Sequence, residues 1–223
     1  MSLETLTCLA LMTFGYIAGS IPFGIVVSKV LGLPDPRTVG SKNIGFTNVL
    51  RVSGKKAGLL TLLGDVAKGW GMAWAASRLL QTEALVLAVA LSPIVGHLFS
   101  LFLGFKGGKG VATAIGVAAG LDLRLGGILL AIWLAVAATT RYSSGAALSA
   151  FAGFPIIAWL MGFNAATVSF ACLVSVLIFW KHRGNIERLL AGTESKMGGR
   201  PEASAGMPLN NSDPSPAPDQ PIS

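Results

Sequence analysis

The sequence contains few charged residues and few cysteines. Asp, Glu, Lys and Arg make up 12% of the 223 residues, about half the share that is usual in soluble domains. Because 52% of the residues are hydrophobic, an intrinsically disordered chain is also excluded. The two cysteines, Cys8 and Cys172, both lie in apolar runs, which argues against a disulfide framework or a cysteine metal site.

Glycine and positive charge, by contrast, are abundant. The chain has 28 glycines among 223 residues, nearly twice the ordinary share of about 7%. Glycine in an apolar chain is typical of helices that pack closely in lipid. The formal net charge is +7, so the functional question is where the basic residues lie.

Long apolar segments predict an all-α integral membrane protein with about seven transmembrane helices. A span needs about 20 apolar residues, because each adds about 1.5 Å across a hydrocarbon core of about 30 Å. The segments are 3–29, 57–80, 84–104, 111–122, 125–140, 145–162 and 164–180. The fourth is short and contains Gly116 and Gly120, so it could form one interrupted element with the fifth. A count of five or six spans therefore stays open.

The basic residues predict the orientation. With seven spans, segments 30–56, 105–110, 141–144 and the region after 180 lie on one side of the membrane. Their basic residues include Arg37, Lys42, Arg51, Lys55, Lys56, Lys106, Lys109, Arg141, Lys181 and Arg183. By the positive-inside rule this side is cytoplasmic, with the N-terminus outside and the C-terminus in the cytoplasm. We expect a multi-pass protein of the cell inner membrane with a site facing the cytoplasm.

The last part of the chain has a different composition. Residues 201–223 contain six of the eleven prolines and no aromatic residue, so they cannot bury enough apolar surface to become ordered. We predict one membrane domain over 1–200 and a disordered, Pro-rich cytoplasmic tail over 201–223.

The first of three polar blocks covers residues 40–56 and reads GSKNIGFTNVLRVSGKK. If residues 43–52 form a helix, Ser41 precedes it and can cap its backbone N–H groups. Three side chains would then lie on one helix face: Asn43, Thr47 and Arg51. With Asn48, these groups favour an anion site, since a guanidinium binds phosphate oxygens in pairs. The alternative is a basic loop on anionic lipid, which explains the two lysines at 55 and 56 but not the hydroxyl and amide groups.

The second block, residues 96–113, reads GHLFSLFLGFKGGKGVAT. Gly107, Gly108 and Gly110 surround Lys109 directly before an apolar segment, and Lys106 precedes them. Glycines let backbone N–H groups face a ligand, and a following helix N-terminus adds positive potential. We predict a phosphate-binding loop that is not a Walker A motif, because Gly110 follows the lysine. The alternative is a flexible turn between spans.

The third block, residues 180–196, reads WKHRGNIERLLAGTESK. It predicts a short amphipathic helix on which His182, Asn185 and Leu189 share a face. His182 and Asn185 could therefore point into a site beside the first two blocks, and interfacial lipid binding is an equally favoured alternative. Ser143 and Ser144 lie in the loop between two predicted spans on the same side.

Two further polar features lie inside predicted spans. Asp65 and Lys68 are three residues apart and are expected to neutralise each other, because an unpaired charge there is costly. His97 is either a proton carrier or, more commonly for such a residue, a polar side chain satisfied by a neighbouring helix.

Taken together, the blocks resemble the bacterial membrane acyl-phosphate:glycerol-3-phosphate acyltransferases, the PlsY family. The likeness runs from about residue 15 to residue 198. The matching stretches are GSIPFG at 19–24, GSKNIGFTNVLR at 40–51, KKAGLLTLLGDVAKG at 55–69, GHLFSLFLGFKGGKGVAT at 96–113 and HRGNIERLLAGTESK at 182–196. Two residues depart from the family pattern, because Lys42 and Phe46 stand where the family usually has Gly and Ala.

The resemblance implies one chemistry. An acyl group passes from an acyl phosphate to the 1-hydroxyl of sn-glycerol 3-phosphate, giving lysophosphatidic acid and phosphate in the first step of phospholipid biosynthesis. It implies no metal, no cofactor and no nucleic acid. The partners would be the two substrates, membrane lipid and, functionally, the soluble enzyme that makes acyl phosphate.

Site residues follow from the blocks and the resemblance. The predicted catalytic residues are Ser41, Arg51, Lys109, His182 and Asn185. The predicted substrate-binding or phosphate-binding residues are Asn43, Thr47, Asn48, Lys106, Gly107, Gly108, Gly110, Ser143, Ser144 and Glu187. The group that takes the hydroxyl proton stays open between His182 and a substrate phosphate, with the phosphate preferred and His182 and Asn185 orienting glycerol 3-phosphate.

Two other classes of function compete with an acyltransferase. A small organic-anion transporter or channel would use the same basic clusters, but transporter sites lie near the membrane midplane and these cations gather at one face. A non-catalytic lipid-binding membrane subunit is the second alternative.

Overall fold

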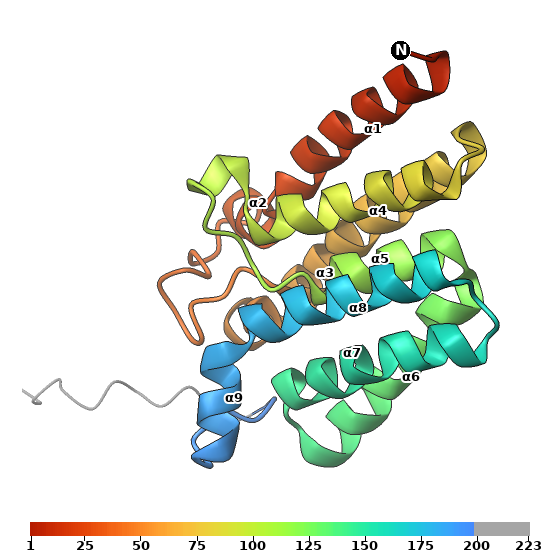
Figure 1. Ribbon diagram of the computed structural model, residues 1–223. Coiled ribbons are helices and arrows are strands. Elements are labelled where there is room, and N and C mark those ends of the chain that lie inside the picture. Colours follow the sequence, from red (N-terminus) through yellow and green to blue (C-terminus); the bar gives the residue numbers. More distant parts are fainter. Residues whose placement is uncertain (199–223) are drawn as a thin grey trace, which may run out of the picture.

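The computed structural model describes residues 1–198, and within that range the chain forms helices and no strand (Figure 1). The predicted tail, 201–223, lies outside the described residues. The elements are α1 (Leu3–Ser20), α2 (Phe23–Val30), α3 (Phe46–Leu79), α4 (Glu83–Leu98), the 3₁₀ turn η1 (Leu101–Leu103), α5 (Val111–Leu121), α6 (Leu123–Thr140), α7 (Ser143–Leu160), α8 (Ala165–Lys181) and α9 (Arg183–Leu190). The all-helical class is confirmed.

Every predicted apolar segment contains a helix, but the seven-span count is not confirmed. Four segments are long and apolar enough to cross a bilayer: Leu3–Ser20, Glu83–Leu103, Leu123–Thr140 and Ser143–Leu160. A fifth arises only if α8 and α9, bent by 63°, count as one span. The segment at 111–122 yields an 11-residue helix, α5, which spans only about 17 Å at about 1.5 Å per residue.

Local chemistry explains two breaks in the helices. The predicted first segment, 3–29, divides into α1 and α2 around Pro22, because proline lacks the N–H that a continuing helix requires. Helix α3 is interrupted at Gly54, which has φ 86° and ψ 178°. Residues 46–53 therefore form a short first part of α3, and a 25-residue helix follows.

The two ends of the helix bundle differ in their polar contacts. The long helices alternate in direction, so the loops on the predicted cytoplasmic side gather at one end (Figure 1). At the opposite end, the Glu4 carboxylate accepts hydrogen bonds of 2.8 Å from the backbone N–H groups of Gln81 and Thr82. Glu83 likewise accepts from the Thr167 hydroxyl at 2.8 Å.

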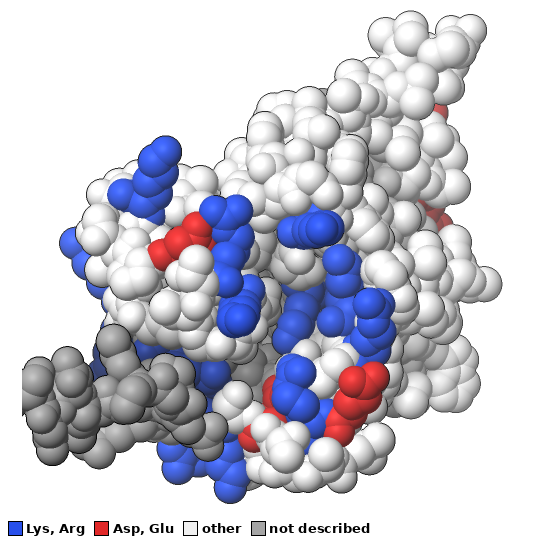
Figure 2. Space-filling view, turned by 90° about the vertical axis from the view of Figure 1, so that its left-hand side faces the viewer, with Lys and Arg blue, Asp and Glu red and all other residues white. Residues whose placement is uncertain are grey.

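Basic side chains concentrate at the first of these ends. Figure 2 shows Lys and Arg side chains around a hollow on the face where α2, residues 99–110 and α9 lie, with few Asp and Glu side chains among them. This placement agrees with the sequence prediction that the basic residues share one side.

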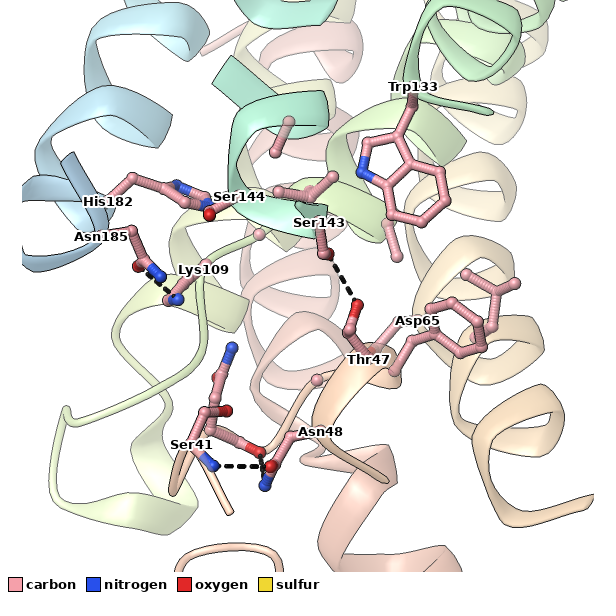
Figure 3. A pocket seen from close by; sticks show the side chains of 18 of the residues that line it. Ser41, Thr47, Asn48, Asp65, Lys109, Trp133, Ser143, Ser144, His182 and Asn185 are labelled. Atoms are coloured by element: carbon pink, nitrogen blue, oxygen red, sulfur yellow. Dashed lines mark hydrogen bonds between the residues drawn. The ribbon is translucent and has the colours of Figure 1, made fainter. Parts of the chain in front are cut away.

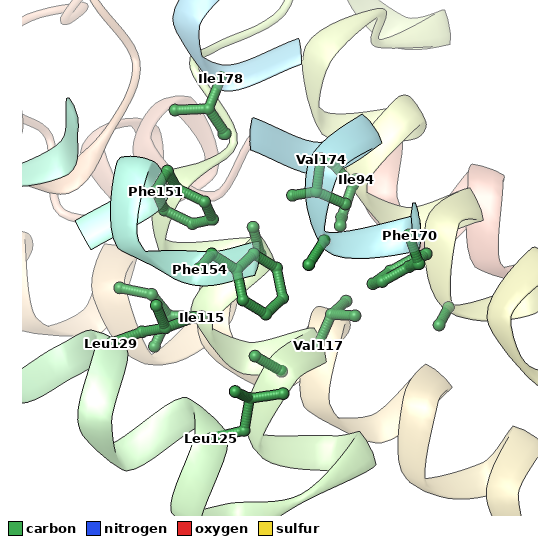
Figure 4. Close-up of a cluster of buried hydrophobic side chains, with 14 of the residues drawn as sticks. Ile94, Ile115, Val117, Leu125, Leu129, Phe151, Phe154, Phe170, Val174 and Ile178 are labelled. Carbon is green, nitrogen blue, oxygen red and sulfur yellow. The ribbon is translucent and has the colours of Figure 1, made fainter. Parts of the chain in front are cut away.

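The main apolar core lies among α4, α5, α6, α7 and α8 (Figure 4). Its largest side chains include Phe151 and Phe154, which pack edge to face with ring centroids 5.9 Å apart. Beside it, α3 and α5 pack backbone against backbone at Gly69, where an added Cβ would lie 2.1 Å from the Thr113 carbonyl oxygen. This close approach is one of the uses of glycine that the composition predicts.

A buried polar cluster ties α3 to its neighbours. The Lys68 ammonium lies 2.8 Å from the Asp65 carboxylate and donates to the Ile21 carbonyl at 3.0 Å. The expected neutralisation of this pair is confirmed. His97 Nδ1 lies 3.2 Å from the Thr113 hydroxyl and 3.4 Å from Asp65, so neighbouring helices satisfy the imidazole.

Candidate active site

Residues from several separated segments of the chain line one cavity of about 450 Å³ (Figure 3). One part of its wall is polar and the other is apolar. The polar and charged lining residues are Ser41, Asn43, Thr47, Asn48, Arg51, Asp65, His97, Lys109, Ser143, Ser144, His182, Asn185, Arg188, Glu194 and Ser195. All five predicted catalytic residues lie among them, so the structure brings the three sequence blocks together.

Three helices begin at the polar part of the cavity, and none has a side-chain cap. They are α3, which begins after Gly45, α5, which begins after Gly110, and α7, which begins at Ser143. The residues at all three starts line the cavity. The first backbone N–H groups of a helix have no partner within the helix and carry a partial positive charge. The cavity therefore receives uncapped N–H groups from three directions, as anion sites do.

Three of the four helices that begin at the opposite end of the bundle do have side-chain caps, and α4 does not. Ser2 accepts a hydrogen bond from the first turn of α1, Asp122 accepts from α6, and Asn164 accepts from α8. The starts of α3, α5 and α7 at the cavity thus lack the side-chain acceptors that α1, α6 and α8 have.

Lys109 adds a full positive charge to this region. Its ammonium donates to the Asn185 side-chain oxygen at 2.5 Å (Figure 3). Burial lowers the pKa of Lys109 to about 8; Arg188 adds to the decrease and Glu194 opposes it. At neutral pH the Lys109 amine is therefore mostly protonated. Because its partner Asn185 is uncharged, the positive charge is not neutralised and can interact with an anion.

Arg51 supplies a second cation from the first part of α3. One guanidinium nitrogen, Nη2, donates to the Lys196 carbonyl at 3.4 Å. The buried Nε has no hydrogen-bond partner within residues 1–198. An unpaired buried donor on a cavity wall is costly unless a ligand satisfies it, which is consistent with the predicted phosphate contact.

His182 and Asn185 face the cavity from the start of α9, as their predicted shared face requires. His182 is 2% exposed and Asn185 is 6% exposed. His182 Nδ1 lies 2.8 Å from the Ile178 carbonyl, which can only accept, so Nδ1 carries the proton and Nε2 is left as an acceptor. Burial and, secondarily, the charge of Lys109 lower the pKa of His182 to about 4, and the imidazole is therefore neutral at pH 7.

Glu194 is a site residue that the sequence prediction missed. Its carboxylate accepts from the Ser144 hydroxyl and the Asn185 amide, both at 2.6 Å, and from Arg188 Nε at 2.8 Å. These hydrogen bonds to Ser144, Asn185 and Arg188 lower the pKa of Glu194 despite its burial. Gly192, with φ 70°, signals the end of α9, but no sequence signal shows that the chain then returns to the cavity.

The first polar block is arranged differently from the prediction. Helix α3 begins at Phe46, not at 43, and its N-cap is Gly45. Asn43 and Ser41 therefore lie in the preceding loop, where Ser41 caps no helix, although both line the cavity. Lys42, at the family's usual glycine position, has φ 56°, the left-handed conformation that glycine adopts most easily.

Asn48 organises that loop. Its amide nitrogen lies within hydrogen-bond distance of the carbonyls of Pro36, Val39 and Asn43 (2.9, 3.1 and 2.9 Å), and its oxygen accepts from the Ser41 N–H at 2.8 Å. The amide is thus engaged within the protein and positions the loop. Thr47 and Ser143 pair through their hydroxyls at 2.8 Å (Figure 3).

Four predicted binding residues do not line the cavity. The backbone N–H groups of Gly107 and Gly108 donate to the carbonyls of Leu98 and His97 at 3.2 and 3.0 Å, so the last turn of α4 occupies them. Lys106 precedes this contact on an exposed turn, and Glu187 lies on the exposed face of α9. Gly110, in contrast, lines the cavity as the N-cap of α5.

The apolar part of the cavity lies between α3, α5 and α6. Its apolar lining residues are Phe46, Leu62, Val111, Ala112, Ile115, Leu130, Trp133, Leu134 and Ala147. Trp133 stands on the wall facing Ser143 and Thr47 in Figure 3. One cavity thus combines a polar end that carries two cations with an apolar end.

The family comparison and the sequence relatives give the same family name. The glycerol-3-phosphate acyltransferase family matches residues 9–192. The glycerol-3-phosphate acyltransferase of Methylobacillus flagellatus is 50% identical over 82% of this chain and 93% of the relative. The same-named protein of Bordetella pertussis is 51% identical over 85% of this chain and 91% of the relative.

Solved structures agree with the sequence relatives. The glycerol 3-phosphate form of PlsY (YgiH), an integral membrane glycerol 3-phosphate acyltransferase, is similar with a TM-score of 0.82 and 36% identity, covering 86% of this chain and 96% of that chain. Its lysophosphatidic acid form has a TM-score of 0.80 at 34% identity, covering 85% and 95%. The chain therefore belongs to the glycerol-3-phosphate acyltransferase family, and its fold is that of the integral membrane protein PlsY.

Proposed function

We propose that this protein transfers an acyl group from an acyl phosphate to the 1-hydroxyl of glycerol 3-phosphate, giving lysophosphatidic acid and phosphate. One observation carries the proposal. Three uncapped helix starts, Lys109 and Arg51 meet at one end of a cavity whose other end is apolar. Both substrates bear a phosphate group and one bears a hydrocarbon chain, so the two ends match the two chemistries.

The phosphates would bind at the polar end. The N–H groups at the starts of α5 and α7, with Lys109 and Arg51, can hold phosphate oxygens. His182 and Asn185 lie beside them and would orient the glycerol hydroxyls. The acyl chain would extend along the apolar wall between α3, α5 and α6, among residues such as Ile115, Leu130 and Trp133.

The chemical step needs no covalent enzyme intermediate. The hydroxyl oxygen of glycerol 3-phosphate attacks the acyl carbonyl carbon, and the bond from that carbon to the phosphate oxygen then breaks. Phosphate leaves with the electron pair, and the hydroxyl proton ends on a phosphate oxygen, so charge and atoms balance. An acyl phosphate is a mixed anhydride and already activated, so catalysis rests on positioning and charge stabilisation.

The low pKa of His182 favours a substrate phosphate as the acceptor of the hydroxyl proton. His182 has a pKa of about 4, whereas a phosphate monoester has its second pKa at about 6. A substrate phosphate is therefore the stronger candidate for the proton acceptor. Neutral His182 would accept a hydrogen bond from the substrate hydroxyl at Nε2 and hold it in line for attack.

We further propose the complete membrane arrangement. The protein lies in the bacterial inner membrane with α1, α3, α4, α5, α6, α7 and α8 crossing, the N-terminus outside and the cavity facing the cytoplasm. The basic residues at the cavity end support this orientation. A cytoplasmic cavity would receive acyl phosphate from the soluble enzyme that makes it and commit the product to phospholipid biosynthesis.

The proposal is tested by assaying the purified full-length protein with palmitoyl phosphate and glycerol 3-phosphate. Phosphate and lysophosphatidic acid should appear in equal amounts. Arg51→Ala and Lys109→Ala should each lower kcat/KM at least about tenfold, equal to about 1.4 kcal/mol of barrier. Arg124→Ala, at the opposite end of the bundle and exposed, is the control that should keep wild-type activity.

The same assay tests the proton acceptor. His182→Gln should retain turnover within about tenfold of wild type, because it removes an orienting hydrogen bond and no obligatory base. A loss of several orders of magnitude with intact substrate binding would assign the proton to His182 instead. Absence of any product from the wild-type protein in both detergent and lipid would contradict the acyltransferase proposal itself.

A further inference from the structure

Phe46 and Trp133 contact each other across the cavity. Their ring centroids lie 6.5 Å apart with an interplanar angle of 62°, an edge-to-face arrangement. Phe46 is the first residue of α3, and Trp133 lies in the second half of α6. Both line the cavity, so the pair bridges two helices that begin at opposite ends of the bundle.

Beside this pair the cavity wall reaches the lipid-facing surface. Leu130 and Leu134 flank Trp133 on α6 and also line the cavity. Leu130 is nevertheless 43% exposed and Leu134 is 54% exposed. Helix α3 packs chiefly against α5, whereas α6 packs chiefly against α7 and α5. The cavity therefore reaches the outer surface of the bundle between α3 and α6, which would face lipid in the membrane arrangement proposed above, and the aromatic pair lies at this opening.

The pair also stands at the boundary between the polar and apolar parts of the cavity. Phe46 is followed directly by Thr47, whose hydroxyl bonds to Ser143 at the start of α7. In the proposed function, an acyl chain whose reacting carbonyl lies at the polar end would pass the two rings with its first carbons. Those carbons are where a branch or ring on the chain would meet Phe46 and Trp133.

We propose that Phe46 and Trp133 form an aromatic gate that selects acyl chains by their width next to the carbonyl group. The proposal rests on the acyl-transfer function proposed above. A linear chain passes along the ring edges, whereas a chain branched near the carbonyl has to separate the rings. Removing the phenyl group of Phe46 therefore tests the gate.

The experiment compares palmitoyl phosphate with a 2-methyl-branched acyl phosphate of the same chain length, using the purified full-length protein. Phe46→Ala should raise the branched-to-linear ratio of kcat/KM about tenfold, the effect expected when a hydrophobic pocket gains room for one methyl group. Trp133→Leu should raise the same ratio. The double variant should gain less than the two single gains combined, because both changes open one contact.

Phe14→Ala is the matched control, since Phe14 is a 62% exposed phenylalanine of α1 that does not line the cavity, and it should leave the ratio unchanged. An unchanged ratio in Trp133→Leu and Phe46→Ala, with normal turnover of palmitoyl phosphate, would overturn the gate alone. Trp133→Leu decides the matter if Phe46→Ala does not fold. Failure of the wild-type protein to use palmitoyl phosphate would instead refute the underlying function.

Discussion

Lys109 is the residue whose ionisation most directly affects the site. Burial brings its pKa to about 8, against an ordinary value of 10.5. The ammonium is charged below pH 8 and loses its proton as the pH rises through that value. Because the neutral amine cannot stabilise a phosphate, the proposed activity would depend on the protonated form.

We therefore expect kcat/KM to fall above about pH 8 in the wild-type protein, since this parameter reports the ionisation of the free enzyme. In Lys109→Arg the guanidinium stays charged over this pH range. The kcat/KM of that variant should therefore not fall above about pH 8, whatever its absolute value. Profiles of kcat/KM from about pH 6 to about pH 10 would check this. If Lys109→Arg kept the alkaline fall of the wild type, another group would be responsible for it.

Residue spacing predicted some of the site and missed other parts for definable reasons. The helical spacing of His182 and Asn185 placed both side chains on the cavity face of α9. Spacing could not place Glu194, because it lies beyond the helix, where tertiary contacts set the path of the chain. The N–H groups of Gly107 and Gly108 donate to carbonyls at the end of α4, which the sequence alone does not reveal. Gly108 also allows the close approach of His97, whose Nε2 would lie 2.4 Å from an added Cβ.

At the scale of the elements, the packing of α3 on α5 depends on Gly69. Because Gly69 has no side chain, the Thr113 carbonyl can lie close to its backbone. A Cβ added at Gly69 would be only 2.1 Å from that carbonyl oxygen. Since α5 begins at the cavity and follows Lys109 directly, a displaced α5 would also move the site.

Gly69→Ala should therefore lower the free energy of unfolding by about 1–3 kcal/mol, the usual range for overpacking. Gly71→Ala is a control in the same helix, because an added Cβ there meets nothing within 4 Å, and it should leave stability unchanged or slightly raised. Thermal unfolding of the purified variants would compare them. Equal midpoints for the two variants would contradict the packing account.

The apolar runs predicted where helices form better than how many cross the membrane. Each run produced a helix because internal hydrogen bonding is the only way to satisfy a backbone in lipid. The count of seven is not confirmed at α5, which has 11 residues, or at α3, whose charged residues Asp65 and Lys68 are paired internally. The mean hydropathy of a segment counts both charged residues as polar even when they neutralise each other. A helix such as α3, which lies inside the bundle, can therefore have a mean hydropathy too low for a predicted span.

For the whole molecule, the proposed seven crossings put residues 81 and 124 outside and residue 56 in the cytoplasm. Single-cysteine variants Gln81→Cys, Arg124→Cys and Lys56→Cys, made with Cys8 and Cys172 replaced by Ser, can be treated in intact cells with an impermeant thiol reagent. We expect labelling at 81 and 124 and protection at 56.

Labelling at position 124 distinguishes between the possible numbers of membrane crossings. It lies at the turn between α5 and α6, and Arg124 has a 78% exposed side chain. If α5 and α6 formed one re-entrant element, Arg124→Cys would be protected while Gln81→Cys was labelled. If only Lys56→Cys were labelled, the orientation would be the reverse of the proposed one.

The three uncapped helix starts have a thermodynamic consequence for the protein as a whole. In the free protein their N–H groups lack strong acceptors, and an anion that supplies them binds the folded state but not the unfolded chain. Such binding adds stability by mass action, about 2.7 kcal/mol when the anion is at 100 times its Kd. Inorganic phosphate, the proposed leaving group, fits the same donors as the substrates. If phosphate is the leaving group, as proposed, the anion that stabilises the free protein would also compete with the substrates for the same donors, so its concentration would affect both the stability of the fold and the rate of the proposed reaction.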